Sequence, residues 1–370
     1  MEIMNLEDCC EILDSMRIPI TESDREEGKY PYYGANGIQD YVADYIFDDE
    51  LVLLAEDGGN FGSKEKPIAY RVSGKCWVNN HAHVLKPKAS LNVDYLCYSL
   101  MFYKVEGMIN GATRQKLTQA AMRKMKIPLR SMKEQVYIVE QLNYINQIKT
   151  QRQRELKLLE NLIRARFVEM FGDPVLNEKG WKIVTVGDIV TEVRYGTSKP
   201  AVEGGKYPYL RMNNLTADGH LDLKDLKYID ISEDEIEKCV VRKGDVLFNR
   251  TNSIELVGKT AVFDLTEEMV IAGYIIRVRL TKEMLPVVFS QYMNLEPLKV
   301  ILRGMAKGAV NQANINAQEL QSIKVYIPDM KLQNQFADFV QQIDKSKDSV
   351  QKALDEAQLL FDSLMQQYFG

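Results

Sequence analysis

The sequence lacks the features that mark membrane, secreted and zinc-binding proteins. Its 370 residues contain no apolar run near the roughly 20 residues that a membrane span needs. A secretory signal has a basic region followed by an apolar one. The acidic first segment, MEIMNLEDCCEILDS, has neither. The five cysteines are scattered and never spaced C-x-x-C, which favours buried free thiols over disulfides or a zinc site. We therefore expect a cytoplasmic protein that does not contact a membrane.

Histidine is also scarce. The chain has three, of which His81 and His83 could share one face of a strand, as metal ligands would. A metal site needs several convergent groups, and the neighbouring sequence offers no third ligand. Hydrogen-bonding roles are the expectation for both, and no metal ligand is assigned.

Two short motifs begin to match catalytic ones without completing them. SIELVGKT (253–260) fits the phosphate-binding pattern G-x-x-x-x-G-K-[ST] only at Gly258, Lys259 and Thr260, and AVFDL after it favours a strand where the pattern requires a helix. Asp-x-Lys pairs at 222–224 and 225–227 have the spacing of half a magnesium-nuclease motif, which arises by chance where 27% of residues are charged. The sequence thus predicts no catalytic residue and no enzyme acting alone.

Charge is distributed unevenly along the chain. The net charge is -5, yet residues 1–60 carry 3 basic and 16 acidic side chains, whereas residues 104–130 carry 7 basic and 1 acidic. A solvated helix face is the ordinary interpretation of a basic run. On an otherwise acidic protein it also forms a local positive patch, which could meet nucleic acid.

The sequence is internally repeated. Short segments recur in the same order at offsets of 177 to 198 residues: EGKYPYYGANGI (27–38) and GGKYPYLRMNNL (204–215), GATRQ (111–115) and GAVNQ (308–312), SMKEQ (131–135) and DMKLQ (329–333), MFG (170–172) and YFG (368–370). A repeat of this kind determines the architecture. We predict four segments, with globular regions at 1–130 and 173–328 and helical regions at 131–172 and 329–370.

Each helical region has an apolar seam with alternating spacings of three and four, as in a coiled coil. The seam residues are Leu142, Ile145, Leu156 and Leu159 in the first copy and Val340, Ile343, Leu354 and Phe361 in the second. Both copies place a lysine at the same step, Lys149 and Lys347. Without internal Pro or Gly, each helix can run for about 38 residues, roughly 57 Å. Two such helices most simply pair with each other; the alternative is that each packs on its own globular region.

The globular regions mix strands and helices. Runs of strand length occur at 51–55, 245–249, 259–265, 274–280 and 323–328, and helices are predicted at 91–106 and 286–304. The fold class is α+β, present twice.

Polar and aromatic loop residues recur at matching places in the two copies, which favours binding because binding residues often lie on loops held by a rigid scaffold. Asn, Gln and Arg can bond base edges, and Lys can hold phosphates. The candidate DNA-binding residues are Tyr32, Tyr33, Asn36, Asn60, Lys64, Arg114, Gln115 and Lys116 in the first copy, and Tyr209, Arg211, Asn213, Asn214, Arg250, Asn252, Lys307, Asn311 and Gln312 in the second. For each alone, tyrosine in a core and Asn-Gly in a turn are the structural alternatives.

Taken together, the ordered motifs resemble the specificity subunit of type I restriction-modification enzymes. YPYYGANG, LAEDGGNFG and NNHAHVLKP in the first half, YPYLRMNNL, KGDVLFNRTNS and VGKTAVF in the second, and two helices ending in Phe-Gly carry the resemblance over essentially the whole chain. It implies two target-recognition domains held apart by a pair of antiparallel helices with pseudo-twofold symmetry. Each domain would read one half of an asymmetric, bipartite DNA site.

The resemblance also implies partners. Two methyltransferase subunits would dock on the helices and restriction subunits would add translocation and cleavage. S-adenosylmethionine, ATP and Mg would then be bound by the partner subunits, with no cofactor on this chain. Because the first 60 residues are acidic and DNA affinity depends on neutralising phosphates, we expect the isolated chain to bind DNA weakly.

Three alternatives stay open at this point. The chain could be the specificity subunit of a related fused methyltransferase-nuclease system, a self-contained nuclease, or a coiled-coil scaffold without DNA specificity. The helix length limits the spacer between half-sites to about 17 base pairs.

Overall fold

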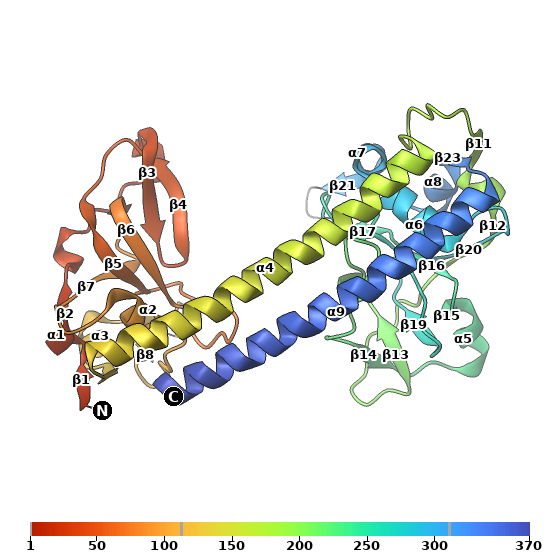
Figure 1. The fold of residues 1–370 in the computed structure, drawn as a ribbon. Coiled ribbons are helices and arrows are strands. Elements are labelled where there is room, and N and C mark those ends of the chain that lie inside the picture. Colours follow the sequence, from red (N-terminus) through yellow and green to blue (C-terminus); the bar gives the residue numbers. More distant parts are fainter. Residues whose placement is uncertain (1, 112–113, 310–311) are drawn as a thin grey trace. The chain divides into compact units, whose positions relative to one another are not determined.

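A computed structural model describes residues 2–111, 114–309 and 312–370. The candidate residue Asn311 lies outside the described residues. The chain forms two compact units: unit 1 holds residues 1–152 and 353–370, and unit 2 holds residues 153–352 (Figure 1). The predicted segments follow the order of elements along the chain, whereas the units divide each long helix between them.

Unit 1 is built on a six-stranded sheet with the order β2-β7-β5-β6-β3-β4, in which only β3 and β6 pair in parallel. Its strands are β2 (Cys10–Ile12), β3 (Glu27–Gly34), β4 (Gly37–Val42), β5 (Phe47–Ala55), β6 (Ala69–Val78) and β7 (Ala82–Pro87). The central strand β5 is fully buried from Leu51 to Ala55, since it faces side chains on both sides of the sheet. The predicted strand at 51–55 is confirmed.

Short elements complete unit 1. They are two ribbons, β1 (Glu2–Asn5) with β10 (Lys126–Leu129) and β8 (Ile109–Asn110) with β9 (Lys116–Leu117), the helices α1 (Leu6–Cys9), α2 (Val93–Met101) and α3 (Gln119–Arg123), and the single turns η1 (Asp14–Met16) and η2 (Glu22–Asp24). Asn92 caps α2 by accepting from the N–H groups of Asp94 and Tyr95, so the helix predicted at 91–106 is present but begins at Val93 and ends at Met101.

Eight strands of unit 2 form two four-stranded sheets, β12-β20-β16-β18 and β14-β13-β19-β15. These strands are β12 (Val190–Tyr195), β13 (Tyr207–Leu210), β14 (Lys227–Ile229), β15 (Val240–Val241), β16 (Val246–Asn249), β18 (Thr260–Val262), β19 (Met269–Ile271) and β20 (Ile275–Leu280). Around them lie β11 (Lys182–Thr185) paired with β23 (Lys324–Ile327), a small sheet of β17 (Thr251–Asn252), β22 (Gln312–Asn314) and β21 (Lys307–Ala309), the helices α5 (Glu233–Cys239), α6 (Pro286–Asn294), α7 (Glu296–Met305) and α8 (Ala317–Ser322), and the turns η3 (Val186–Ile189) and η4 (Met212–Asn214).

Two predictions for unit 2 need correction. The single helix expected at 286–304 is two helices, because Pro297 lacks an N–H donor and its ring collides with the carbonyl four residues earlier, so the helix restarts at Glu296. The strand expected at 259–265 is limited to Thr260–Val262. The segment after Gly258 is nevertheless a strand, which confirms that no phosphate-binding helix begins there.

Matching residues make matching bonds in the two units. Glu2 pairs with Leu129 in the first ribbon, and Lys182 pairs with Ile327 in its counterpart. The N–H of Leu6 donates to the carbonyl of Met125 at 2.8 Å, as the N–H of Val186 donates to that of Ile323. The repeated sequence therefore builds repeated local structure.

The long helices α4 (Met132–Phe171) and α9 (Met330–Phe369) each have 40 residues, as predicted within two residues. In unit 1, the first part of α4 and the last part of α9 share one core, which includes Leu142 and Phe361. In unit 2, Phe167 near the end of α4 lies 5.5 Å from Phe336 near the start of α9, ring centre to ring centre. All five cysteines are free and buried, as expected. None of the helices in the described part of the chain combines the length with the apolar composition of a membrane span.

Candidate nucleic-acid interface

Four loops of unit 1 meet around the carboxyl end of β5. Their polar side chains form what we call the first loop surface, defined by Asn36, Asp57, Asn60, His81, Arg114 and Lys116. Asn36 donates from Nδ2 to the carbonyl of Gly58 at 3.0 Å, and Asn60 donates to Oδ1 of Asn36 at 3.1 Å. These two bonds join the turn between β3 and β4 to the loop that follows β5.

Arg114 is anchored at one nitrogen and open elsewhere. Its Nη2 donates to Oδ1 of Asp57 at 2.6 Å and lies 3.2 Å from Nδ1 of His81. The side chain is 61% exposed, so the other guanidinium donors face outward. A guanidinium held at one end and free at the other is suited to a bidentate contact with guanine or phosphate.

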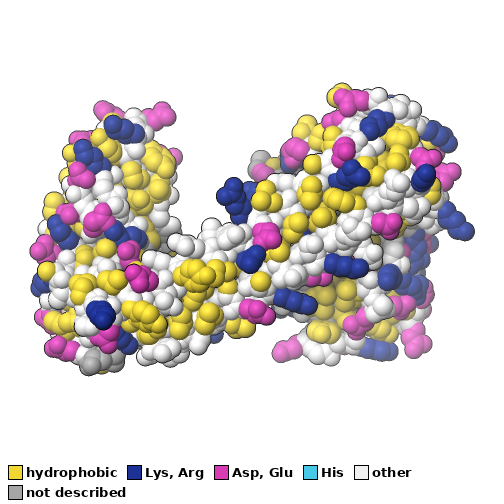
Figure 2. Space-filling model, in the orientation of Figure 1, with side chains coloured by type: hydrophobic (Ala, Val, Ile, Leu, Met, Phe, Trp, Pro, Cys, Tyr) yellow, Lys and Arg dark blue, Asp and Glu magenta, His cyan; other side chains and the backbone are white. Residues whose placement is uncertain are grey.

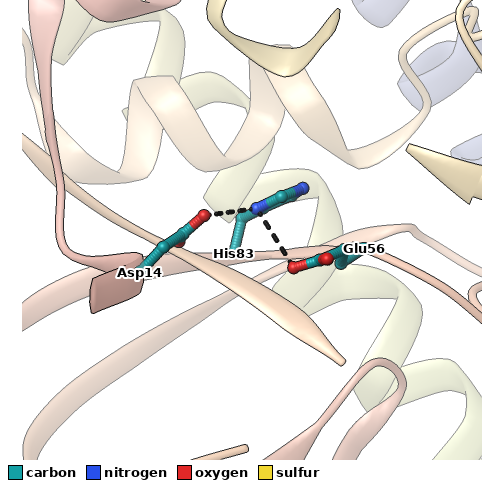
Figure 3. Close-up of side chains that lie close together, drawn as sticks. All are labelled: Asp14, Glu56 and His83. Carbon is teal, nitrogen blue, oxygen red and sulfur yellow. Dashed lines mark hydrogen bonds and ion pairs between the residues drawn. The ribbon is translucent and has the colours of Figure 1, made fainter. Parts of the chain in front are cut away.

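A buried ionic group lies beneath this surface (Figure 3). Nδ1 of His83 lies 2.7 Å from Oδ2 of Asp14 and 3.6 Å from Oε2 of Glu56, and its other ring nitrogen is 2.9 Å from the carbonyl of Leu117. Burial alone would raise the pKa of Asp14, but bonds from His83 and from the Val84 N–H hold that pKa below its ordinary value. His83 thus connects the core of unit 1 to β9, which carries Lys116.

The same group could be taken for a metal site, because one ligand atom from each residue lies within 4.8 Å of the others. Cations already occupy its carboxylates: Glu56 accepts from Arg17 at 2.6 Å and from Lys116 at 2.9 Å. Burial alone would raise the pKa of Glu56, but these two bonds lower it. The expected hydrogen-bonding roles of His81 and His83 are confirmed, and we assign the group to positioning of the loops.

In unit 2, the small sheet β17-β22-β21 brings four candidates together. We call Arg250, Asn252, Lys307 and Gln312 the second loop surface. The guanidinium of Arg250 lies 4.9 Å from the ring centre of Tyr195 and donates to the carbonyl of Gly273 at 3.3 Å. Lys307 pairs with Glu319 at 2.5 Å while its side chain stays 79% exposed. Its donors, like those of Arg114, remain available on the surface.

Arg211 and Asn213 lie on a separate element, the turn η4. Arg211 donates from Nη2 to Oδ2 of Asp225 at 2.7 Å, and Asn213 is exposed. Lys259 stabilises the turn by donating to the carbonyl of Met212 at 2.9 Å. Lys64 and Gln115 of unit 1 are also exposed, on the loops of the first loop surface.

Three candidate residues are corrected by their burial. Tyr32 and Tyr209 are 1% and 5% exposed and Asn214 is 2% exposed. The Tyr209 hydroxyl donates within the unit to the carbonyl of Lys199, and the Asn214 amide donates to that of Asp222. The alternative of core tyrosines therefore applies to both, and Asn214 is a turn residue.

Other candidates are half-buried. The ring of Tyr33 lies 5.7 Å from that of Tyr70, and Asn252 donates to Oδ1 of Asn249 at 2.8 Å. Sequence reasoning missed Asp57 and Arg17, since acidic residues are not expected on a DNA surface and the partners of these two lie far away in the chain. The Glu-Asp pair directly after a buried strand was the available signal.

The seam residues are all at least partly buried. Leu142, Ile145, Val340 and Phe361 are buried, and Leu156, Leu159, Ile343 and Leu354 are half-buried. The repeated seam lysines have local partners, since Nζ of Lys149 lies 4.5 Å from the ring centre of Phe361 and Lys347 pairs with Asp218 at 2.9 Å.

Two glycines that precede β9 and β22 have backbone angles in the same unusual region. Gly111 and Gly308, which match in the repeat, have φ angles of 99° and 122°, a region that favours glycine. A Cβ atom at either position would collide with a carbonyl oxygen, that of Arg114 in unit 1 and that of Gln312 in unit 2. The two loop surfaces thus share one backbone construction.

The fold and the two loop surfaces define a class of protein: two mixed α/β units that each carry polar and basic loops, linked by long helices. The chain matches the family model of the type I restriction modification DNA specificity domain twice, over residues 1–158 and 178–358. It belongs to that family. As a member, it is a component of DNA specificity and not a catalytic subunit.

Individual relatives agree. A Haemophilus influenzae protein provisionally described as a type I restriction enzyme specificity subunit is 27% identical over 94% of this chain and 89% of its own length. The EcoKI specificity subunit of Escherichia coli is 25% identical over 86% of this chain and 72% of its own. The crystal structure of the S subunit of a type I system from M. genitalium shares the fold, with a TM-score of 0.56 and 15% identity over 100% of this chain and 96% of that one.

Proposed function

We propose that this chain is the DNA-recognition subunit of a type I restriction-modification system, and that each unit reads one half of an asymmetric, bipartite site. Double-stranded DNA is then the ligand of both loop surfaces. The chain itself binds no cofactor. S-adenosylmethionine, ATP and Mg are bound by the partner subunits.

One observation carries this proposal: the two loop surfaces have the same construction and different chemistry. The N–H of Leu117 donates to the carbonyl of Glu56 at 2.7 Å, and the N–H of Ile315 donates to that of Arg250 at 2.9 Å, at matching positions of the repeat. In unit 1 the bond joins the residue after β5 to β9, and in unit 2 it joins the residue after β16 to the residue after β22. Glu56 in unit 1 is buried and corresponds to Arg250 in unit 2. The exposed cation of the first loop surface is Arg114, whereas that of the second is Lys307, so the same scaffold presents different side chains, as reading two different half-sites requires.

Apolar side chains on the long helices support docking of the methyltransferase subunits. Tyr137 and Tyr144 on α4 are 56% and 65% exposed within unit 1, and Leu158 and Leu162 on the same helix are 57% and 46% exposed within unit 2. Hydrophobic side chains also reach the surface over the long helices in Figure 2. Solvent-exposed apolar residues on neighbouring helical turns are typical of a partner interface.

The self-contained nuclease is not favoured. Its Asp-x-Lys pairs are engaged locally: Asp222 accepts from the N–H of Lys224 at 3.0 Å, and Asp225 pairs with Arg211 at 2.7 Å and with Lys227 at 3.3 Å.

The deciding experiment maps adenine methylation across the genome of the source cell with this gene intact and deleted. Loss of methylation at one split, asymmetric motif on deletion is the expected result. An unchanged methylome, in a strain where the partner methyltransferase is shown to be produced, would contradict the proposal. Electrophoretic shifts at moderate salt test the partners' contribution, since we expect much weaker DNA binding by the isolated chain than by its complex with methyltransferase subunits.

A further inference from the structure

A pocket in unit 2 is lined by basic side chains from three parts of the chain. Its volume is about 320 Å³. Its charged lining residues are Arg164 on α4, Glu255 and Lys259 on the loop after β17 and its junction with β18, and Glu296, Lys299 and Arg303 on α7. Four are cationic and two are acidic, which leaves a formal charge of +2 in the pocket.

The two lysines are buried, which is unusual for lysine. Each is 9% exposed. Lys299 donates to the carbonyl of Gly258, and Lys259 donates to the carbonyls of Met212 and Leu215. An ammonium group has three donors, so these bonds leave donor capacity on both residues.

The acidic residues do not balance this charge. Glu296 pairs with Arg303 at 2.6 Å, so one acid and one base are already matched. Burial, with the nearby charges of Arg303 and Lys259, lowers the pKa of Lys299 to about 7. The buried ammonium group of Lys299 therefore lacks a negatively charged partner.

We propose that this pocket binds a phosphate group, with Lys299, Lys259 and Arg164 as its cationic ligands. The group would belong to a small phosphate-bearing molecule or, if the proposed DNA recognition holds, to the DNA backbone. A doubly charged phosphate matches the excess charge, and its several acceptor oxygens can use the lysine donors that the carbonyls leave open. The chemistry differs from that of a phosphate-binding loop, because side-chain ammonium groups replace backbone N–H groups.

Binding in the pocket would act on a loop that carries a candidate reading residue. Lys259 holds the carbonyls on either side of Asn213, which is exposed on the turn η4. A phosphate that draws the ammonium group of Lys259 toward the pocket competes with these bonds. Binding of phosphate in the pocket is therefore coupled to the position of Asn213.

The test is calorimetric titration of the full chain with inorganic phosphate. We expect Lys299→Met to weaken binding at least about tenfold, since it removes a charge-assisted hydrogen bond. Arg164→Gln should weaken it by up to about fivefold, as for an exposed ion pair. Lys243→Met and Arg154→Gln are matched controls at exposed positions and should leave binding unchanged. Because Arg164 is exposed on α4, its variant keeps the test valid even if Lys299→Met alters folding.

A second titration separates the two sources of phosphate. If inorganic phosphate does not bind but Lys299→Met weakens DNA binding of the complete complex and reduces its salt dependence by about one ion, the phosphate is that of DNA. If phosphate binds, the variants weaken it and Lys299→Met leaves DNA binding of the complete complex unchanged, the ligand is a small molecule. If neither effect occurs, the proposal is wrong. The phosphate titration needs no DNA, so failure of the proposed function would leave its result interpretable.

Discussion

Gln135 and Gln333 make the same three hydrogen bonds in two different units. Each lies in the first turn of a long helix and is fully buried. Gln135 donates to the carbonyls of Ser90 and Arg130, both at 2.9 Å, and accepts from the N–H of Asn92 at 2.7 Å. Gln333 donates to two carbonyls, also at 2.9 Å, and accepts from an N–H at 2.9 Å. One amide side chain thus joins each long helix to the segment that precedes a helix of its unit.

Replacing this amide should destabilise the unit that contains it. Gln135→Ala removes a buried amide that bonds two carbonyls and one N–H, and each lost hydrogen bond of this kind costs about 1 kcal/mol. We expect a loss of about 3 kcal/mol in the free energy of unfolding, measured by urea denaturation, and a similar loss for Gln333→Ala.

Gln147→Ala is the control, since Gln147 is exposed on the same helix as Gln135. Equal stability of the Gln135 and Gln147 variants would show that the buried bonds contribute nothing net.

Arg114→Ala should weaken base discrimination at one half-site of the DNA target only. The mutation removes the exposed guanidinium that Asp57 anchors, and loss of one bidentate base contact costs about 1–3 kcal/mol, or roughly tenfold to a hundredfold in discrimination. The measurement is the methylation motif of cells that carry the variant.

The companion variant Arg250→Ala should relax the other half-site and leave the first unchanged. Lys104→Ala, at an exposed basic position of unit 1, should leave both unchanged. If Arg114→Ala and Arg250→Ala both relaxed the same half-site, the assignment of one unit to each half would be wrong.

Acid should weaken unit 1 through Asp14. Its pKa is lower in the folded state than in the unfolded chain, so its contribution is present above the unfolded value of about 3.9 and is lost as the pH falls through the folded value. Asp14→Asn should be less stable than the unmodified protein at pH 7 by about 3 kcal/mol, because His83 and Arg17 lose a charged partner. That difference should narrow below pH 4 in thermal melts; a difference that stayed constant from pH 7 to pH 3 would contradict the linkage.

Lys299 should make stability depend on pH in the same direction as Asp14, but in an alkaline window. Because its pKa is about 7 in the folded protein and about 10.4 in the unfolded chain, the unfolded state binds more protons between these values, and stability rises with pH across that window. Lys299→Met removes this slope and should melt at a higher temperature than the unmodified protein near pH 7. Parallel melting curves from pH 7 to pH 9.5 would count against a buried, poorly compensated ammonium group.

The sequence predicted the elements whose signal is local or repeated. The long helices were predicted within two residues because nothing in 40 residues breaks them. The strand at Leu51–Ala55 was recognisable because a strand buried on both faces is a continuous apolar run. The repeat also located the glycine loops that support both loop surfaces.

What the sequence could not give is the three-dimensional partner of each polar side chain. Asp14, Glu56 and His83 are separated by up to 69 residues and meet because β7 pairs with β2 on one side and with β5 on the other. The sequence alone predicts Tyr32 and Asn214 as exposed loop residues. The pattern of polar and apolar residues around them does not show which side of the strand or turn the rest of the unit covers. Lys299 lay in a segment read as one continuous helix, so its burial beside Lys259 had no local signal.

The division of α9 between the units has a consequence for synthesis on the ribosome. Unit 2 has all of its residues once residue 352 is made, but unit 1, begun first, still lacks residues 353–370. At about 5–20 residues per second, roughly 10 to 40 s pass between the synthesis of residue 152 and that of residue 370. Throughout that time the rings of Tyr95 and Tyr98, which Phe369 and Phe361 contact in the finished protein, have no cover from α9. The unit translated first is thus the last to be completed, and its open core is the surface that chaperones would meet on the nascent chain.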